Sequence, residues 1–239
     1  MSQTTKKGFL IARFDHGIFD EIITFIDDYG NKFVCLAKGT KKIYSKNARN
    51  LQIGNYCEFI FFLAREINKM SKLVKVNAIK QIQWPIFKTS FFLLNELANK
   101  LIYPSIKNFN FYKNLLPITI NSSFNDQKTQ LIILQKFCKL SGIELFVDKC
   151  VLCGSKKIKT INFNLNGLIC KDCFAQNNKE LYPLNFNKLV YFLFKEKYDL
   201  IDNFNNYYQT LINYLITYIK NSLGIKIFDS NFFHFYNKK

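Results

Sequence analysis

The sequence predicts an α+β protein with two domains, in which a closed five-stranded barrel precedes an all-helical domain with an inserted four-cysteine segment. Three observations predict this class. Apolar residues form short strand-like runs before residue 80, they recur at helical spacing after it, and two CxxC pairs interrupt the helical pattern within residues 147–174. The predicted domains are therefore residues 1–80 and residues 81–239.

Five apolar, β-branched or aromatic runs are the candidate strands of the first domain. They are residues 7–13, 21–26, 32–38, 56–65 and 73–79. The segment from Asp28 to Asn31, with Gly30 inside it, is a good turn between the second and third runs. Five short strands with turn-rich connections fit a small closed barrel, and the five-stranded OB-fold is the obvious candidate.

The hydrophobic period changes after Trp84 and Pro85 from strand-like to helical. Helical stripes are expected over residues 87–101, 123–142, 186–193 and 208–224. Asn125 or Asp126 can cap the start of the second stripe, and Gly142 can close its end. Core packing explains these stripes without a cofactor, and the domain boundary is expected near residues 80–86.

The composition predicts a cytoplasmic protein with reduced thiols and an acidic partner. The longest apolar run, residues 59–64, is too short to span a membrane, and the apolar run near the N-terminus is too short for a signal peptide. The net charge is +17, but only three of the 34 basic residues are Arg. A bias towards Lys, Asn, Ile and Phe is also what an AT-rich coding sequence produces. Local arrangement of charge is therefore better evidence than the total.

The two CxxC pairs predict one structural metal site. The four cysteines are Cys150, Cys153, Cys170 and Cys173, with sixteen residues between the pairs. Four thiolates about 2.3 Å from one Zn²⁺ form a closed tetrahedral site. Gly154 and Gly167 stand beside the pairs, where a tight turn needs backbone that can take positive φ.

Other interpretations of the cysteines are a redox-active or disulfide pair, and buried cysteines that share this spacing by chance. A redox CxxC would occur once beside a βαβ pattern, which this sequence lacks. A catalytic deaminase zinc would need an H-x-E element, but neither His16 nor His234 has a Glu two residues later. Cys35 and Cys138 fall in apolar runs and are expected to be small buried side chains.

A basic loop after the third predicted strand is the candidate nucleic-acid site. No Asp or Glu occurs between Tyr29 and Cys57. The candidate nucleic-acid-binding residues are Lys38, Lys41, Lys42, Tyr44, Lys46 and Arg49. The cations would attract phosphates, and the Tyr44 ring offers a flat face to an unstacked base. The alternative is a solvated loop in a Lys-rich protein.

Two sets of segments resemble the RecO family, the bacterial recombination mediators of the RecF pathway. They are residues 7–10, Asp20 with 22–25, 30–32, 37–39 with Lys41, Lys42 and Ser45, 51–52, 148–154 and 167–173. The last two resemble the zinc-bearing members. Two departures stand out. Ile18 occupies a position where the family usually has an acid, and Lys41 and Lys42 replace arginines, which keeps charge but loses bidentate phosphate geometry.

The resemblance implies an N-terminal OB-fold, a helical domain with a zinc finger and one structural zinc ion. It implies binding to single- and double-stranded DNA, annealing of complementary strands, and association with RecR and with the tail of single-stranded DNA-binding protein (SSB). RecA would then be loaded onto SSB-coated DNA, in the cytoplasm and at the nucleoid during repair. It implies no catalytic centre, and the sequence contains no P-loop. Alternatives are a zinc-containing protein-interaction adaptor, an RNA-binding protein or, least expected, an enzyme.

Overall fold

The computed structural model describes residues 3–64, 69–83, 88–101, 103–121, 125–177 and 181–227. The chain forms two compact units, Met1–Ile120 and Asn121–Lys239. Each unit is built around its own buried apolar residues. Trp84, Pro85, Phe87 and Ser123, which mark expected element boundaries, lie outside the described residues.

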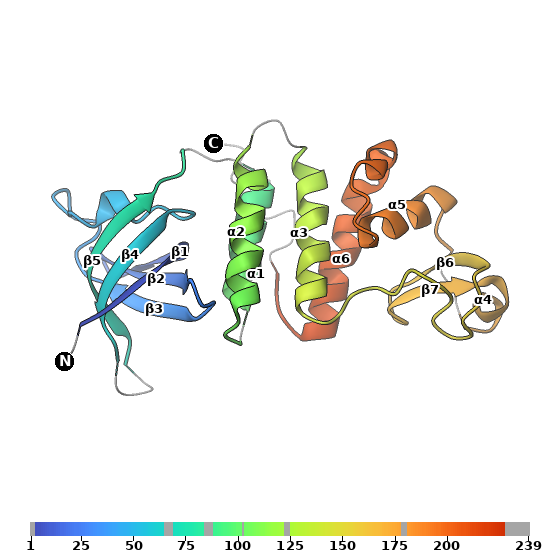
Figure 1. Ribbon diagram of the computed structural model, residues 1–239, viewed down its shortest axis with the longest axis horizontal. Coiled ribbons are helices and arrows are strands. Elements are labelled where there is room, and N and C mark those ends of the chain that lie inside the picture. Colours follow the sequence, from blue (N-terminus) through green and yellow to red (C-terminus); the bar gives the residue numbers. More distant parts are fainter. Residues whose placement is uncertain are drawn as a thin grey trace. The chain divides into compact units, whose positions relative to one another are not determined.

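The first unit begins with a closed five-stranded barrel (Figure 1). Its strands are β1 (Gln3–His16), β2 (Asp20–Asp27), β3 (Lys32–Ala37), β4 (Tyr56–Phe62) and β5 (Ser71–Lys80). They close in the order β1-β2-β3-β5-β4, in which β3 and β5 pair parallel and all other neighbours pair antiparallel. The predicted five-stranded barrel of OB type is confirmed.

Strand β1 is longer than the predicted residues 7–13 because it serves two neighbours. Its first half, from Gln3 to Phe9, pairs with β4, and its second half, from Gly8 to His16, pairs with β2. The register shifts between Leu10 and Ala12, and such a bulge bends a strand and increases its twist. One bent strand thus closes the barrel.

Alternating side chains fill the barrel. In β4, every second residue is buried, including Phe59 and Phe61. The ring of Phe25 stacks on Phe59 with centroids 4.0 Å apart. Cys35 is buried in this core, as predicted, and burial raises the pKa of its thiol to about 12, so that it behaves as a small apolar side chain.

Two helices extend the first unit beyond the barrel: α1 (Thr89–Lys100) and α2 (Ile106–Ile120). The ring of Phe9 in β1 lies 5.6 Å from that of Phe109 and 5.3 Å from that of Tyr112. At Gly30 an added Cβ would lie 1.7 Å from the Ser105 carbonyl oxygen, so this turn needs glycine for close approach. The barrel itself ends at Lys80, and the division of the chain into domains at residue 80 stays a prediction.

The second unit contains α3 (Asp126–Leu140), α5 (Leu184–Phe194), the 3₁₀ segment η2 (Leu200–Tyr207) and α6 (Tyr208–Leu223). The Asn125 side chain caps α3 by accepting a 2.9 Å hydrogen bond from the Lys128 N–H, and Gly142 follows the helix with φ of 72°. Both predicted end signals are confirmed. Cys138 is fully buried, as expected.

Between α3 and α5 lies an insertion with a β-hairpin and a short helix: β6 (Ile158–Asn162), β7 (Gly167–Cys170) and α4 (Lys171–Asn177) (Figure 1). It carries all four predicted metal ligands. Within the described ranges no helix has the length and apolarity needed to cross a membrane.

Candidate metal centre and nucleic-acid interface

The four predicted cysteines converge on one point. The sulfur atoms of Cys150, Cys153, Cys170 and Cys173 lie within 4.8 Å of one another. Those of Cys153 and Cys170 are 3.6 Å apart. A tetrahedral site with metal–sulfur bonds of about 2.3 Å places its sulfurs ~3.8 Å apart. The four thiols therefore fit a single metal ion.

The first pair sits on a tight turn. The Cys150 N–H donates to the Ser155 carbonyl (2.8 Å), and the Gly154 N–H donates to the Cys150 carbonyl (2.9 Å). Gly154 has φ of 75°, a conformation that favours glycine. The predicted role of Gly154 is confirmed.

The second pair is held by secondary structure, because Cys170 ends β7 and Cys173 lies in the first turn of α4. The prediction that Gly167 takes positive φ is wrong, and Asn166 has the positive value of 57° instead. Gly167 is needed for space: an added Cβ would lie 2.4 Å from the Phe146 carbonyl oxygen. The backbone of β7 thereby packs against the segment that precedes Cys150.

Electrostatics distinguish the four thiols. Burial alone would raise the pKa of Cys150, but hydrogen bonds from backbone N–H groups of Cys170, Cys153 and Leu152 bring it down to about 6. The neighbouring Cys153 and Cys170 sulfurs raise the pKa of Cys173 to about 12. One thiolate thus forms readily, and the close approach of the others opposes further ionisation unless a cation compensates the charge.

A metal ion bound by all four sulfurs would have no open position for substrate or water, so it would stabilise the fold and take no part in a reaction. Cys150 and Cys170 are buried with Ile169 in a small apolar cluster. That cluster is the core of the insertion, and four metal–sulfur bonds would supply the stability that so few apolar side chains cannot.

The basic loop, defined as residues 38–49, follows β3 and enters the 3₁₀ turn Ala48–Asn50. All six predicted nucleic-acid-binding residues are exposed: Lys38, Lys41, Lys42, Tyr44, Lys46 and Arg49. The Tyr44 side chain is 86% exposed. The loop presents a continuous run of accessible cations with an accessible ring among them.

Hydrogen bonds tie both ends of the basic loop to the barrel. At its start, the Gly39 N–H donates to Asp20 Oδ1 (2.7 Å) and the Lys41 N–H donates to the Phe19 carbonyl (3.0 Å). At its end, the Asn47 side chain bridges two backbone groups of β5, the Val74 carbonyl and the Val76 N–H. The cations are therefore carried on a loop with fixed ends.

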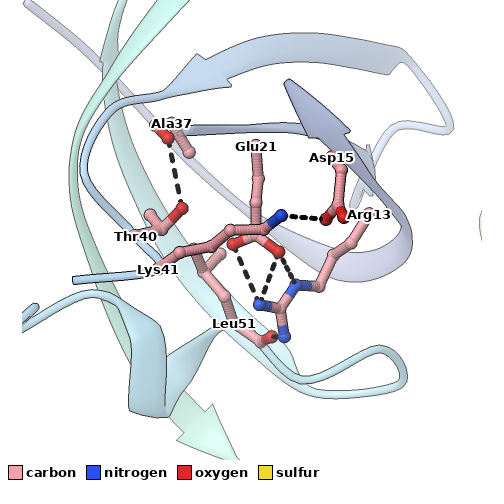
Figure 2. Close-up of polar contacts among 7 residues, drawn as sticks. All are labelled: Arg13, Asp15, Glu21, Ala37, Thr40, Lys41 and Leu51. Carbon is pink, nitrogen blue, oxygen red and sulfur yellow. Dashed lines mark hydrogen bonds and ion pairs between the residues drawn. The ribbon is translucent and has the colours of Figure 1, made fainter. Parts of the chain in front are cut away.

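Ion pairs occupy the acidic groups beside the loop (Figure 2). Arg13 makes a bidentate pair with Glu21, at 2.8 and 2.9 Å from Nη2, and also donates to the Leu51 carbonyl. Glu21 is buried. Asp15, which is exposed, pairs with Lys41 at 2.6 Å. The acids thus stabilise the base of the loop.

Four of the loop cations carry no ion pair within the described part of the chain. They are Lys38, Lys42, Lys46 and Arg49. Lys42 instead lies 5.5 Å above the ring of Phe19 in the β1–β2 turn. Unpaired cations at the mouth of an OB barrel can neutralise phosphate.

Sequence reasoning missed the apolar residues beside these cations. Phe14, Ile18 and Phe19 surround the β1–β2 turn, and Ile43 lies within the basic loop, yet all four are exposed. The usable signal was apolar residues on both sides of Gly17, a turn glycine with φ of 66°. Apolar residues in a tight turn have little chance of reaching a core.

The fold and the cysteine site define a class of protein in which an OB-type barrel precedes a helical region with a four-thiol centre. No family model matches the chain. Curated relatives do match, and those described below are all DNA repair proteins named RecO.

The RecO protein of Mycoplasma mycoides is 26% identical over 235 residues, which cover 93% of each chain. That of Mesoplasma florum is 24% identical over 97% of this chain and 90% of its own. That of Staphylococcus epidermidis is 26% identical over 75% of this chain and 76% of its own. These matches confirm the resemblance to RecO, and they support a role in DNA repair. The four-cysteine cluster is consistent with the zinc-bearing type of RecO.

Proposed function

We propose that the chain is a DNA-binding recombination mediator without a catalytic step of its own. It binds single- and double-stranded DNA through the basic loop, anneals complementary strands, and with RecR helps to load RecA onto SSB-coated single strands in the cytoplasm. The observation that carries the proposal is the set of exposed cations of the basic loop, whose neighbouring acids are already engaged with Arg13, Lys41 and the Gly39 N–H.

The proposed metal is one structural Zn²⁺ held by the four cysteines. Zinc has no geometric preference from its d electrons and is commonly bound by four thiolates in structural sites. The sulfur separations support it, and so do the backbone N–H groups around Cys150, which lower the pKa of its thiol and so favour the thiolate that a metal ion needs. The ion would hold β7, α4 and the first cysteine turn together.

The proposed protein partners are RecR and the acidic tail of SSB. A cavity of about 590 Å³ in the first unit gives one place where an acidic peptide could dock. Its lining includes Phe9, Phe109 and Leu116 together with the exposed Lys80 and Lys113. The one acid among the described lining residues, Asp28, accepts a hydrogen bond from the Tyr56 hydroxyl. Apolar walls with cations beside them suit an apolar side chain next to carboxylates. The same observation favours the alternative of a protein-interaction adaptor.

Fluorescence anisotropy with labelled single strands tests the proposal. Lys41→Glu, Lys42→Glu and Lys46→Glu are combined in one variant. With one phosphate neutralised by each of the five loop cations, the affinity of the native protein should fall with salt at a log–log slope of about −3.5, and the variant, which lacks three of these cations, should lose about 60% of that slope. Unchanged affinity and slope in the variant would remove the basic loop from the DNA site.

The matched control reverses three exposed lysines in the second unit, Lys188, Lys220 and Lys226. It changes net charge by the same amount, so any effect of net charge alone should appear in both variants.

Competition with RNA of equal length separates an RNA-binding protein from a DNA-binding one. Metal-dependent turnover of nucleic acid by the purified protein would refute the non-enzymatic assignment.

A further inference from the structure

Five exposed apolar or aromatic side chains lie on the last residues of β1, on the β1–β2 turn and on the basic loop. We call them the apolar tip: Phe14, Ile18, Phe19, Ile43 and Tyr44. Each is between 50% and 98% exposed, so none of them is needed for the core. Exposed apolar side chains that are concentrated on neighbouring segments commonly mark a binding site.

The two segments that carry the apolar tip adjoin, because hydrogen bonds join the start of the basic loop to the β1–β2 turn and the start of β2. The Lys41 N–H donates to the Phe19 carbonyl (3.0 Å), and the Gly39 N–H donates to the Asp20 carboxylate (2.7 Å). The Lys42 ammonium lies over the Phe19 ring at 5.5 Å. Cations of the basic loop therefore adjoin the apolar tip.

The combination of apolar tip and adjoining cations points to nucleic acid rather than protein. Bases offer flat apolar faces, and phosphates follow them at short intervals, so one ligand satisfies both kinds of side chain. Ile and Phe are side chains that insert between base steps and unstack them. A stack that is already interrupted costs least to open, so such insertion selects the ends of duplexes and forks.

We propose that the apolar tip inserts at the junction between duplex and single-stranded DNA, while the basic loop binds the adjoining phosphates. This inference rests on the proposed DNA-binding function. It adds a ligand, the unstacked base at a junction, and assigns it to Ile18 and Ile43 in particular. Ile43 is the most exposed of the five, and Ile18 lies at the turn between β1 and β2.

A forked duplex with 2-aminopurine at the junction tests the proposal, because the fluorescence of this base rises when it is unstacked. The native protein should raise the fluorescence and bind the fork about fivefold more tightly than a blunt duplex of equal length. The double variant Ile18→Ser with Ile43→Ser should lose both effects. It should keep single-strand affinity within about twofold, since the phosphate contacts dominate that affinity.

Ile79→Ser is the matched control, because Ile79 is exposed on β5 of the same barrel but lies outside the apolar tip. It should behave as the native protein. Unchanged fluorescence and fork preference in the double variant would overturn the inference and assign the apolar tip to a protein partner. A native protein that binds single strands without preferring forks would also overturn it, and the proposed function would stand. If the native protein bound neither single strands nor forks nor duplexes, the proposed function itself would be overturned.

Discussion

The cysteine site and the basic loop differ in how well the sequence motif of each indicates what that region does. The cysteines have a specific spacing, and their four sulfurs converge in a small module in which Cys150 and Cys170 are buried and Cys153 is exposed. The basic loop has no specific residue spacing, only a concentration of cations without acids, and those cations are exposed. The most recognisable motif is thus a structural one, whereas the surface suited to a ligand is recognised by what surrounds it.

The largest expected effect of a single change is at the cysteine site. Cys170→Ser removes one of four ligands, and structural zinc contributes roughly 10–16 kcal/mol to folding in small zinc peptides. The variant should lose stoichiometric zinc and unfold the insertion, while the barrel keeps its DNA affinity. Elemental analysis and amide hydrogen exchange measure the two outcomes. Cys138→Ala, which changes a buried cysteine outside the site, should keep the metal.

The next effect concerns the ion pair beneath the basic loop. Glu21→Gln leaves Arg13 partly buried without its carboxylate partner, and breaking such a pair should cost about 2–3 kcal/mol after allowance for the exposed part of Arg13. Urea unfolding of the native protein and the variant measures this cost as a difference in the free energy of unfolding of the first unit. Asp15→Asn is the contrast, since its pair with Lys41 is largely exposed and should contribute less than about 1 kcal/mol. Equal costs for the two variants would contradict the assignment.

A smaller effect is expected at the end of the basic loop. Asn47→Ala removes the two side-chain hydrogen bonds to β5 and should cost about 1–2 kcal/mol. Because the loop then loses its fixed end, affinity for single strands should fall as well. Asn77→Ala removes one long contact to Glu58 at 3.4 Å on the same barrel, and it should leave affinity unchanged. A loss of stability without any change in affinity would show that loop order is irrelevant to binding.

The smallest effect is in the second unit and depends on pH. Hydrogen bonds from Lys136 and then Lys139 lower the pKa of Glu196 to about 2. A carboxyl with a lowered folded pKa stabilises the protein above its unfolded pKa, and this contribution is lost as the pH falls from about 4.3 towards 2. The Glu196→Gln variant should therefore lose less free energy of unfolding than the native protein between pH values of about 4.3 and 2. At pH 7 its free energy of unfolding should differ from that of the native protein by only a few tenths of a kcal/mol. Thermal melts from pH 2 to pH 7 check it.

Local patterns predicted the five barrel strands and the helices α1, α3, α5 and α6, because strand alternation, helical spacing, the Asn125 cap and the Gly154 turn are all encoded by neighbouring residues. The cysteine site was predictable for the same reason, since its ligands lie in one short segment. Helix α2 and the β6–β7 hairpin were not predicted. The prediction at Gly167 was wrong because it assumed that the glycine is needed for a positive φ. The glycine is needed instead because the Phe146 carbonyl leaves no room for a Cβ.

Long-range contacts were beyond the sequence. Nothing near Arg13 indicates that it pairs with Glu21 and binds the Leu51 carbonyl, because only the barrel register brings these groups together. The apolar tip has the same origin, since the end of β1 with its following turn and the basic loop meet only in the folded barrel. Pairing between strands decides what lies beside the basic loop.

Amide hydrogen exchange with and without a short single strand compares the two regions most directly. DNA should slow exchange in residues 38–50 and 14–20 and leave residues 147–174 unchanged. Protection confined to the cysteine segment, with none in the basic loop, would contradict the assignment of the DNA site to the barrel.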